Sequence, residues 1–261
     1  MSNHQPDHDH GDGLHEDLVT MASRRDALKI FGAGGAATIL STLGASTALA
    51  ATPSGEVPDE TAGPFPGDGS NGVDVLGESG IVRHDIRRSF GDSSTLATGV
   101  PLRVNLTVTD APNDHAPLSG LAVYLWHCDR TGRYSMYSSG VEDENYLRGI
   151  AKTGSDGTAW FKTIFPAAYS GRWPHLHFEI YASVAKAVSN GPIVKTSQIA
   201  LPAAVCKKVY ATSAYAASRS NLARTSLASD MVFGDDEAAH QLATVTGSVK
   251  NGFVANLTIG I

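Results

Sequence analysis

Charge and cysteine are both scarce in this chain of 261 residues, and basic residues are outnumbered by acidic ones. The 20 Lys and Arg against 26 Asp and Glu give a formal net charge of −6. The chain therefore has neither a basic surface for nucleic acid nor a polybasic segment for anionic lipid. Hydrophobic residues make up 42% and charged residues 18% of the sequence, which excludes a disordered or fibrous chain and predicts a globular fold with an ample core. The expected substrate is a small molecule or a polymer.

An unbroken hydrophobic run is missing near the N-terminus. The apolar stretch there is interrupted by Gly, Ser and Thr, follows the pair Arg24 and Arg25, and ends in an A-x-A site at residues 48–50. This pattern predicts an export signal and no stable membrane insertion. The arginine pair resembles that of a bacterial twin-arginine signal, which the export machinery reads as an address. We expect residues 1–50 to be a disordered leader plus signal peptide, and the protein to be exported to the cell envelope or the extracellular space.

Export bears on two other features of the sequence. The twin-arginine pathway is typical of proteins that fold before export, often with a cofactor already bound, so it favours a metal centre. In an oxidising compartment, Cys128 and Cys206 are able to form one disulfide. Two separately buried thiols fit the sequence nearly as well, and both alternatives stay open.

Short β-rich runs recur along residues 51–261 and predict one all-β domain. Most of them alternate apolar and polar residues, as strands with one buried face do, and they span residues 102–110, 121–129, 158–165, 175–182 and 252–261. Their spacing, with turn-forming segments between them, favours an antiparallel β-sandwich. Residues 201–225 have short helical character and are expected to form an excursion between strands. Residues 52–72 are rich in Pro, Gly and acidic residues and predict an extended arm.

Two histidines, His175 and His177, stand in one of these runs with a single residue between them. Because alternate side chains of a strand share a face, both imidazoles are expected to project to the same side. Such a pair chelates zinc, copper or iron on β scaffolds, but it also occurs by chance on exposed strands. Taken alone, the pair supports a metal site and ordinary strand residues about equally.

Two tyrosines near these histidines shift the balance. Tyr169 lies six positions before His175, and Tyr134 follows the run at 121–129. Both tyrosines are also compatible with positions at the rim of the fold, where the hydroxyl stays in water. A phenolate, however, is a hard anionic donor, and two of them favour a trivalent cation by charge neutralisation. Two tyrosines and two histidines would hold Fe(III) with room for solvent or substrate.

Several stretches together resemble the intradiol ring-cleavage dioxygenases, the family of protocatechuate 3,4-dioxygenase and catechol 1,2-dioxygenase. They are "TAGPFPGDGSNG", "GIVRHDIRRSFG", "AVYLWHCDRTGRYSMYS", "YLRGIAKTGSDGTAWFKTIFPAAYSGRWPHLHFEIY" and "VKTSQIALP". The resemblance covers nearly all of residues 51–261. It implies a β-sandwich enzyme with non-haem Fe(III), which uses O2 to cleave a catechol-type diol between its two hydroxylated carbons. The implied product is a cis,cis-muconate-type diacid.

The resemblance also implies roles for individual residues. The four metal ligands that it implies are Tyr134, Tyr169, His175 and His177. Tyr169 is similar to the tyrosinate that the substrate displaces, Arg172 matches the arginine that faces the bound aromatic ring, and Gln198 matches a glutamine behind the ligands. These three residues are the candidate catalytic residues. The N-terminal helical region of the catechol 1,2-dioxygenases has no counterpart here, so their mode of dimerisation does not transfer and a homo-oligomer remains open.

A non-catalytic alternative is an exported β-sandwich that binds carbohydrate or another partner. It requires exposed aromatic platforms, which Trp126, Trp160 and Trp173 would have to supply.

His127 beside Cys128 suggests a soft-metal site or, more simply, a structural histidine. A cupin-like metal oxidoreductase would need a further Glu and His in that family's positions, and the sequence has no convincing match.

Overall fold

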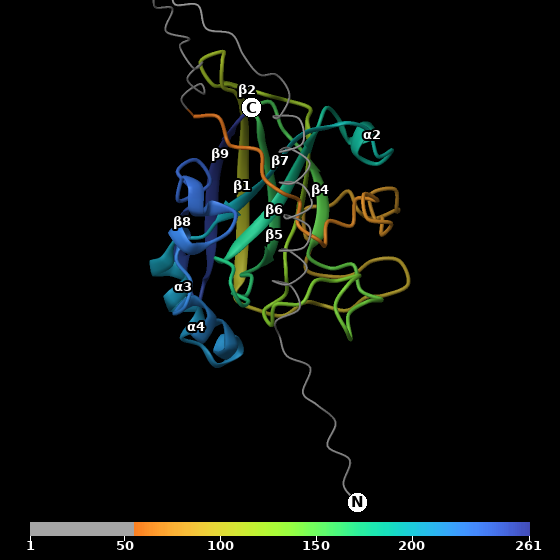
Figure 1. The fold of residues 1–261 in the computed structure, drawn as a ribbon. Coiled ribbons are helices and arrows are strands. Elements are labelled where there is room, and N and C mark those ends of the chain that lie inside the picture. The colour runs from red at the N-terminus through yellow and green to blue at the C-terminus, as the bar shows by residue number, and fades with distance from the viewer. Residues whose placement is uncertain (1–54) are drawn as a thin grey trace, which may run out of the picture.

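The computed structural model of the protein describes residues 55–261, which form two β-sheets packed face to face (Figure 1). The first sheet contains β1 (Pro101–Asp110), β2 (Ala116–Pro117), β5 (Thr158–Ile164), β8 (Thr244–Ser248) and β9 (Gly252–Gly260). Its order is β2-β1-β9-β8, with β5 paired to β1. The second sheet has the order β4-β3-β6-β7 and contains β3 (Ala122–Trp126), β4 (Arg148–Lys152), β6 (His175–Tyr181) and β7 (Ile193–Ala200). The predicted leader and signal peptide lie outside the described residues.

The predicted β-sandwich is confirmed, with one difference in strand direction. Most strand pairs are antiparallel, but β9 runs parallel to β1, with Leu102 opposite Phe253. The chain reaches β9 through the hairpin from β8, which brings the C-terminal strand back beside β1. Parallel strands need a long connection, and here the whole chain from β2 to β8 lies between β1 and β9.

The five predicted strands are all present, and their burial explains the sequence pattern. In β1, Leu102, Val104 and Leu106 are buried between the sheets, and the residues between them are more exposed. All seven residues of β6 are buried. Leu176, Phe178 and Ile180 pack into the core between the sheets, so His175 and His177 point to the opposite side of the second sheet.

Helices are short, as the sequence predicts, and most of them follow β7. They are α2 (Val184–Ala187), α3 (Ala203–Tyr210), η1 (Ser213–Tyr215), α4 (Ala216–Leu222), η2 (Leu227–Ser229) and η3 (Phe233–Asp235). Figure 1 shows α3 and α4 together at the end of the sandwich opposite the C-terminus. Within residues 55–261, no helix has the length and apolar character needed to span a bilayer.

The N-terminal arm lies along the second sheet, and its contacts bear on the site described below. The Glu60 N–H donates to Thr196 O at 2.8 Å, and Val57 N–H donates to Gly260 O at 3.0 Å. Lys195 of β7 is nearly buried, and its ammonium lies 3.2 Å from carboxylate oxygens of both Glu56 and Asp59. These contacts fasten the arm to β7 and to the C-terminal strand.

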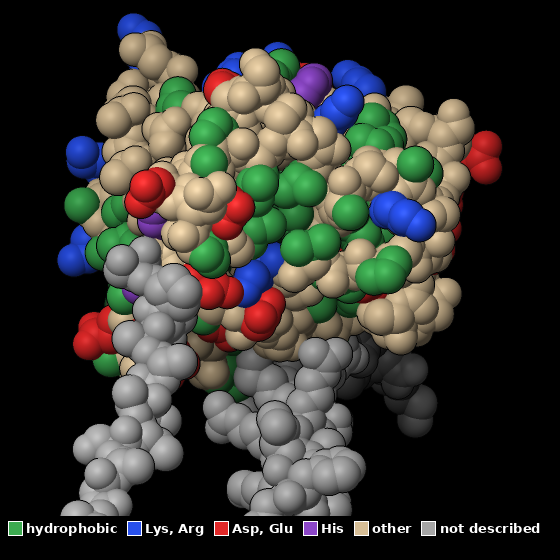
Figure 2. All heavy atoms as spheres, turned by 90° about the horizontal axis from the view of Figure 1, so that it is seen from above, with side chains coloured by type: hydrophobic (Ala, Val, Ile, Leu, Met, Phe, Trp, Pro, Cys, Tyr) green, Lys and Arg blue, Asp and Glu red, His purple; other side chains and the backbone are tan. Residues whose placement is uncertain are grey.

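The face seen in Figure 2 carries a central group of hydrophobic side chains, with Lys or Arg and Asp or Glu side chains close together beside it. Opposite charges are therefore interspersed on this face.

Both cysteines are buried free thiols. Of the two alternatives that the sequence left open, a disulfide or two separate thiols, the structure has the second.

Candidate metal centre

Strand β6 places two imidazoles side by side on the face turned away from the core. His175 and His177 are 3% and 2% exposed, and their Nε2 atoms lie 3.1 Å apart. His177 is the register partner of Trp126 on β3 and of Gln198 on β7. Because the strands are in register, these three side chains lie next to one another across the sheet.

Two tyrosines from separate loops complete the cluster. Tyr134 comes from the loop after β3, and its hydroxyl oxygen lies 3.1 Å from His177 Nε2 and 3.5 Å from His175 Nε2. Tyr169 comes from the segment between β5 and β6, and its hydroxyl oxygen lies 3.1 Å from His175 Nε2 and 3.4 Å from the Tyr134 hydroxyl. The four candidate ligands of the sequence analysis therefore converge on one point.

The spacing of these four donor atoms fits a single metal ion. Imidazole nitrogen binds ions such as zinc at about 2.0–2.1 Å, so two donors on one ion lie roughly 2.9–3.4 Å apart at right-angled or tetrahedral angles. The five contacts given above range from 3.1 to 3.5 Å. Among residues 55–261 there is no group of three or more His, Cys, Asp or Glu that could hold a metal, so the tyrosines are needed to complete a ligand set.

The protonation of the histidines also suits metal binding. Burial lowers the pKa of His175 well below its usual value, and the nearby positive charge of Arg172 lowers it further. Burial likewise lowers the pKa of His177, with His175 and Arg172 adding to the effect. Both rings are therefore neutral at pH 7, which is the form that binds metals.

Each ring is oriented by neighbours outside the cluster. Nδ1 of His175 lies 2.5 Å from the Trp173 carbonyl oxygen, which leaves Nε2 directed at the tyrosines. The ring of His177 stacks on Trp126, with centroids 5.0 Å apart and planes 10° from parallel. The Trp173 carbonyl and the Trp126 ring therefore hold the two imidazole rings in fixed orientations.

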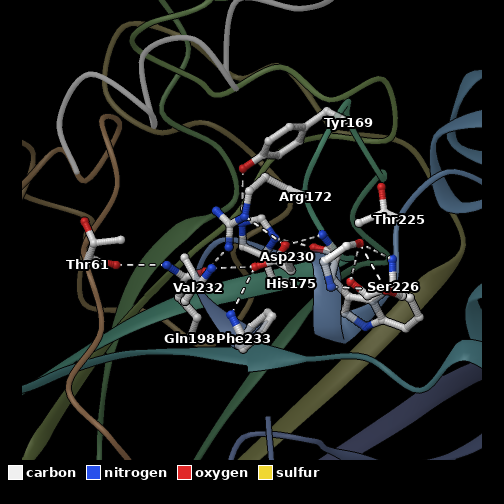
Figure 3. A network of polar contacts seen from close by, with 12 residues as sticks. Thr61, Tyr169, Arg172, His175, Gln198, Thr225, Ser226, Asp230, Val232 and Phe233 are labelled. Atoms are coloured by element: carbon white, nitrogen blue, oxygen red, sulfur yellow. Dashed lines mark hydrogen bonds and ion pairs between the residues drawn. The ribbon is translucent and has the colours of Figure 1, made fainter. Parts of the chain in front are cut away.

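Arg172 and Gln198, the other two predicted catalytic residues, lie together beside the cluster (Figure 3). Both side chains are completely buried. The Nη2 group of Arg172 donates to Gln198 Oε1 at 2.6 Å, and Gln198 Nε2 donates to the carbonyl oxygen of Thr61 in the arm at 2.9 Å. Gln198 therefore connects the N-terminal arm to the arginine.

Two buried residues around the site were missed in the sequence analysis. Asp230, between η2 and η3, pairs with Arg172 at 3.0 Å, and both side chains are 0% exposed. Arg148 of β4 donates from Nη2 to Ser135 O at 2.9 Å and from Nη1 to Pro66 O at 2.8 Å, which fixes the loop that carries Tyr134. Asp230 lies in none of the stretches that carry the resemblance. Arg148 lies inside one of them, but its buried contacts are to residues distant in sequence, which no local pattern predicts.

The other residues singled out from the sequence have structural contacts. His127 is buried, with Nε2 2.6 Å from Thr163 Oγ1 and Nδ1 2.8 Å from Cys128 O. Of the three tryptophans, Trp126 and Trp173 are buried. The ring of Trp160 is covered by a stacked His84 at 4.1 Å and by the Arg103 guanidinium at 4.2 Å. None of the three therefore forms an exposed aromatic platform.

Several known proteins are similar to this chain in sequence or in fold. A family model described as Dioxygenase matches residues 78–177, which include both tyrosines, both histidines and Arg172 of the cluster. The chain is 39% identical over 70 residues to catechol 1,2-dioxygenase 1 of Acinetobacter lwoffii. It is 34% identical over 109 residues to 6-chlorohydroxyquinol 1,2-dioxygenase of Cupriavidus pinatubonensis. The first match covers 26% of this chain and 22% of the relative, and the second covers 35% of this chain and 38% of the relative.

A solved structure matches over a much larger share of both chains. The intradiol ring-cleavage dioxygenase from Tetranychus urticae superposes with a TM-score of 0.62 at 25% identity, covering 79% of this chain and 94% of that one. The likeness therefore extends over both sheets, well beyond the segment that the family model matches. In local sequence and in fold, the chain is therefore similar to the intradiol ring-cleavage dioxygenases.

Proposed function

We propose that the protein is a non-haem Fe(III) dioxygenase that cleaves catechol-type aromatic diols between their two hydroxylated carbons. The observation that carries this proposal is the convergence of two phenol oxygens and two imidazole nitrogens, joined by five contacts of 3.1 to 3.5 Å. The two imidazoles would hold the ion as neutral donors, and the two phenolates would offset two of its three positive charges. Such a hard, anionic ligand set favours a trivalent ion over a divalent one.

Bound there, Fe(III) would supply a Lewis acid that holds the deprotonated diol and passes electron density from it to O2. Among the residues of the chain, Tyr169 would accept the proton that the diol loses on binding. Its side chain is 8% exposed, against 3% for Tyr134, so it is the tyrosine that an entering substrate reaches more easily. Its phenolate oxygen would accept a proton from one diol hydroxyl as the substrate binds.

Arg172 would act on charge that develops in the substrate ring. Its guanidinium lies beside His175 in Figure 3 and is fixed by Gln198 and Asp230. A buried, preoriented cation stabilises negative charge more strongly than a solvated one, because little solvent screens it and no reorganisation is needed. The overall reaction adds one O2 to the diol, and both oxygen atoms enter a cis,cis-muconate-type diacid.

The non-catalytic alternative has little support. A carbohydrate-binding surface needs exposed aromatic rings, and the three tryptophans are buried or covered by other side chains of the chain. A binding module also gives no reason for four buried metal-type donors at one point. The similarity to intradiol ring-cleavage dioxygenases supports the enzyme as well.

The first experiment is the visible spectrum of the purified mature protein after addition of iron. We expect a red-brown tyrosinate-to-iron charge-transfer band, which shifts to longer wavelength when catechol is added without oxygen. His175→Gln should abolish the band, whereas His84→Ala, a histidine on the opposite sheet's surface, should leave it unchanged. A wild-type protein that stays colourless with iron would reject the proposal.

We also propose that the protein is exported by the twin-arginine machinery. The support is the arginine pair at Arg24 and Arg25 and the cleavage site at residues 48–50, which lie outside the described residues. The double variant Arg24→Lys and Arg25→Lys should remain in the cytoplasm in its uncleaved form. Normal export and cleavage of that variant would contradict a twin-arginine route.

A further inference from the structure

Arg172 is held by a carboxylate from a distant part of the chain. The Arg172 Nε–H donates to Asp230 Oδ2 at 3.0 Å, and both side chains are 0% exposed. A buried guanidinium needs a partner of opposite charge, because removing one member of such a pair leaves an uncompensated charge in a medium of low polarity. Asp230 supplies that partner from the segment between η2 and η3.

The same carboxylate accepts three further hydrogen bonds, all from backbone amides. Oδ2 accepts the Trp173 N–H at 2.6 Å, and Oδ1 accepts the N–H groups of Val232 at 2.8 Å and Phe233 at 3.1 Å. With four donors around it, the side chain acts as an acceptor only, which is the ionised form of a carboxyl group. Asp230 is therefore fixed to its own loop by Oδ1 and to the site by Oδ2.

These contacts determine where the guanidinium lies. Because the guanidinium is planar and rigid, fixing Nε also fixes the direction of both Nη groups. Nη2 then meets Gln198 Oε1 at 2.6 Å. The backbone of Arg172 is held as well, because its N–H donates to Tyr169 O at 3.3 Å and the next residue is bound to Asp230.

We propose that Asp230 is a positioning residue for Arg172 and thereby sets how strongly the guanidinium stabilises negative charge on the substrate ring. This inference rests on the proposed dioxygenase function. A residue that only stabilised its own loop would not change turnover through Arg172. The proposed role of Asp230 requires that effect. Figure 3 shows the aspartate on one side of the arginine and Gln198 on the other.

The test is a double-mutant cycle on the iron-loaded mature protein, with catechol as substrate. Asp230→Asn keeps the shape of the side chain but removes its charge, and we expect it to lower kcat by roughly 10–100-fold with little change in KM. In an Arg172→Met background, the same substitution should change kcat by less than about threefold. Equal losses in both backgrounds, or a wild-type kcat for Asp230→Asn, would overturn the proposal.

Two further variants serve as a control for charge removal and as a replacement if Asp230→Asn does not fold. Asp85→Asn removes an ion pair with Arg87 at the protein surface, and it should leave kcat unchanged. If Asp230→Asn does not fold, Asp230→Glu keeps the charge but shifts the carboxylate, and it should still lower kcat by roughly threefold or more. Wild-type turnover by Asp230→Glu would then contradict the role in positioning.

A structural measurement separates this inference from the proposed function. If wild-type protein turns over no catechol, the proposed function fails. Crystal structures of the wild type and Asp230→Asn would still show whether Asp230 determines the position of the Arg172 guanidinium. We expect the Arg172 guanidinium in the variant to leave Gln198 Oε1. A guanidinium that keeps that contact would refute the role of Asp230 whether or not the enzyme is active.

Discussion

The Tyr134 hydroxyl oxygen lies 3.1 Å from His177 Nε2, although the two residues are 43 positions apart and come from different elements. This contact joins a loop residue to a strand residue inside the candidate metal centre. If both atoms bind iron, Tyr134→Phe and Tyr169→Phe should each reduce the charge-transfer absorbance of the iron-loaded protein. The control is Tyr146→Phe, a buried tyrosine whose hydroxyl contacts Asp129, and its absorbance should equal that of the wild type. Full absorbance in both site variants would exclude the tyrosines as ligands.

Gln198 links the arm to Arg172, so its loss should reduce activity without removing the metal. Gln198→Ala removes the hydrogen bond that Gln198 donates to Thr61 O and the one that it accepts from Arg172. We expect kcat to fall by roughly 10-fold with unchanged iron content. The matched control is Gln241→Ala, which removes another fully buried glutamine, one that bonds to Ser197. Equal kcat losses in the two variants would mean that Gln198 matters only for packing.

Glu60 in the arm should make stability depend on pH. Burial, reinforced by Asp235, raises its pKa from 4.5 to about 7. The folded protein therefore keeps a proton that the unfolded chain releases near its ordinary value. This contribution to stability is fully present below pH 4.5 and is lost as the pH rises through about 7.

Urea denaturation at about pH 5 and about pH 8 provides the measurement for Glu60. The free energy of unfolding of the wild type should fall between these two pH values by more than that of Glu60→Gln, whose side chain stays neutral. An identical fall in both proteins would show that Glu60 does not titrate in this range.

The two cysteines should react with a thiol reagent only after unfolding. Cys128 and Cys206 are both buried free thiols, and burial raises the pKa of each. Reaction requires an accessible thiolate, so native protein should show no reactive thiol and denatured protein two, without any reductant. A denatured protein that reacts only after reduction would demonstrate a disulfide instead.

The histidine pair of the site could be predicted from the sequence alone, because strand periodicity is a local property. The pair His175 and His177 follows from the alternation of β6, and the structure places both rings on one face. The positions of Tyr134 and Tyr169 depend on loop paths, which no short pattern encodes. Their donor chemistry and their nearness in sequence to the histidines suggested a ligand set, and the family resemblance then implied their roles.

Other features depend on contacts between distant parts of the chain. Asp230 lies in an irregular segment far from Arg172 in sequence, and its role becomes visible only when η2 and η3 are packed beside β6. The strand β4 was missed because Arg148–Lys152 is short and contains a glycine. The parallel pairing of β1 and β9 likewise follows from the path of the whole chain.

The most direct test of the account is product analysis after reaction of catechol with ¹⁸O2 and the iron-loaded mature protein. We predict cis,cis-muconate that carries both labelled oxygen atoms, and no product with His175→Gln. An unreacted catechol pool, a ring-cleaved semialdehyde from attack beside the hydroxylated carbons, or a product with only one labelled oxygen would contradict the proposed intradiol cleavage.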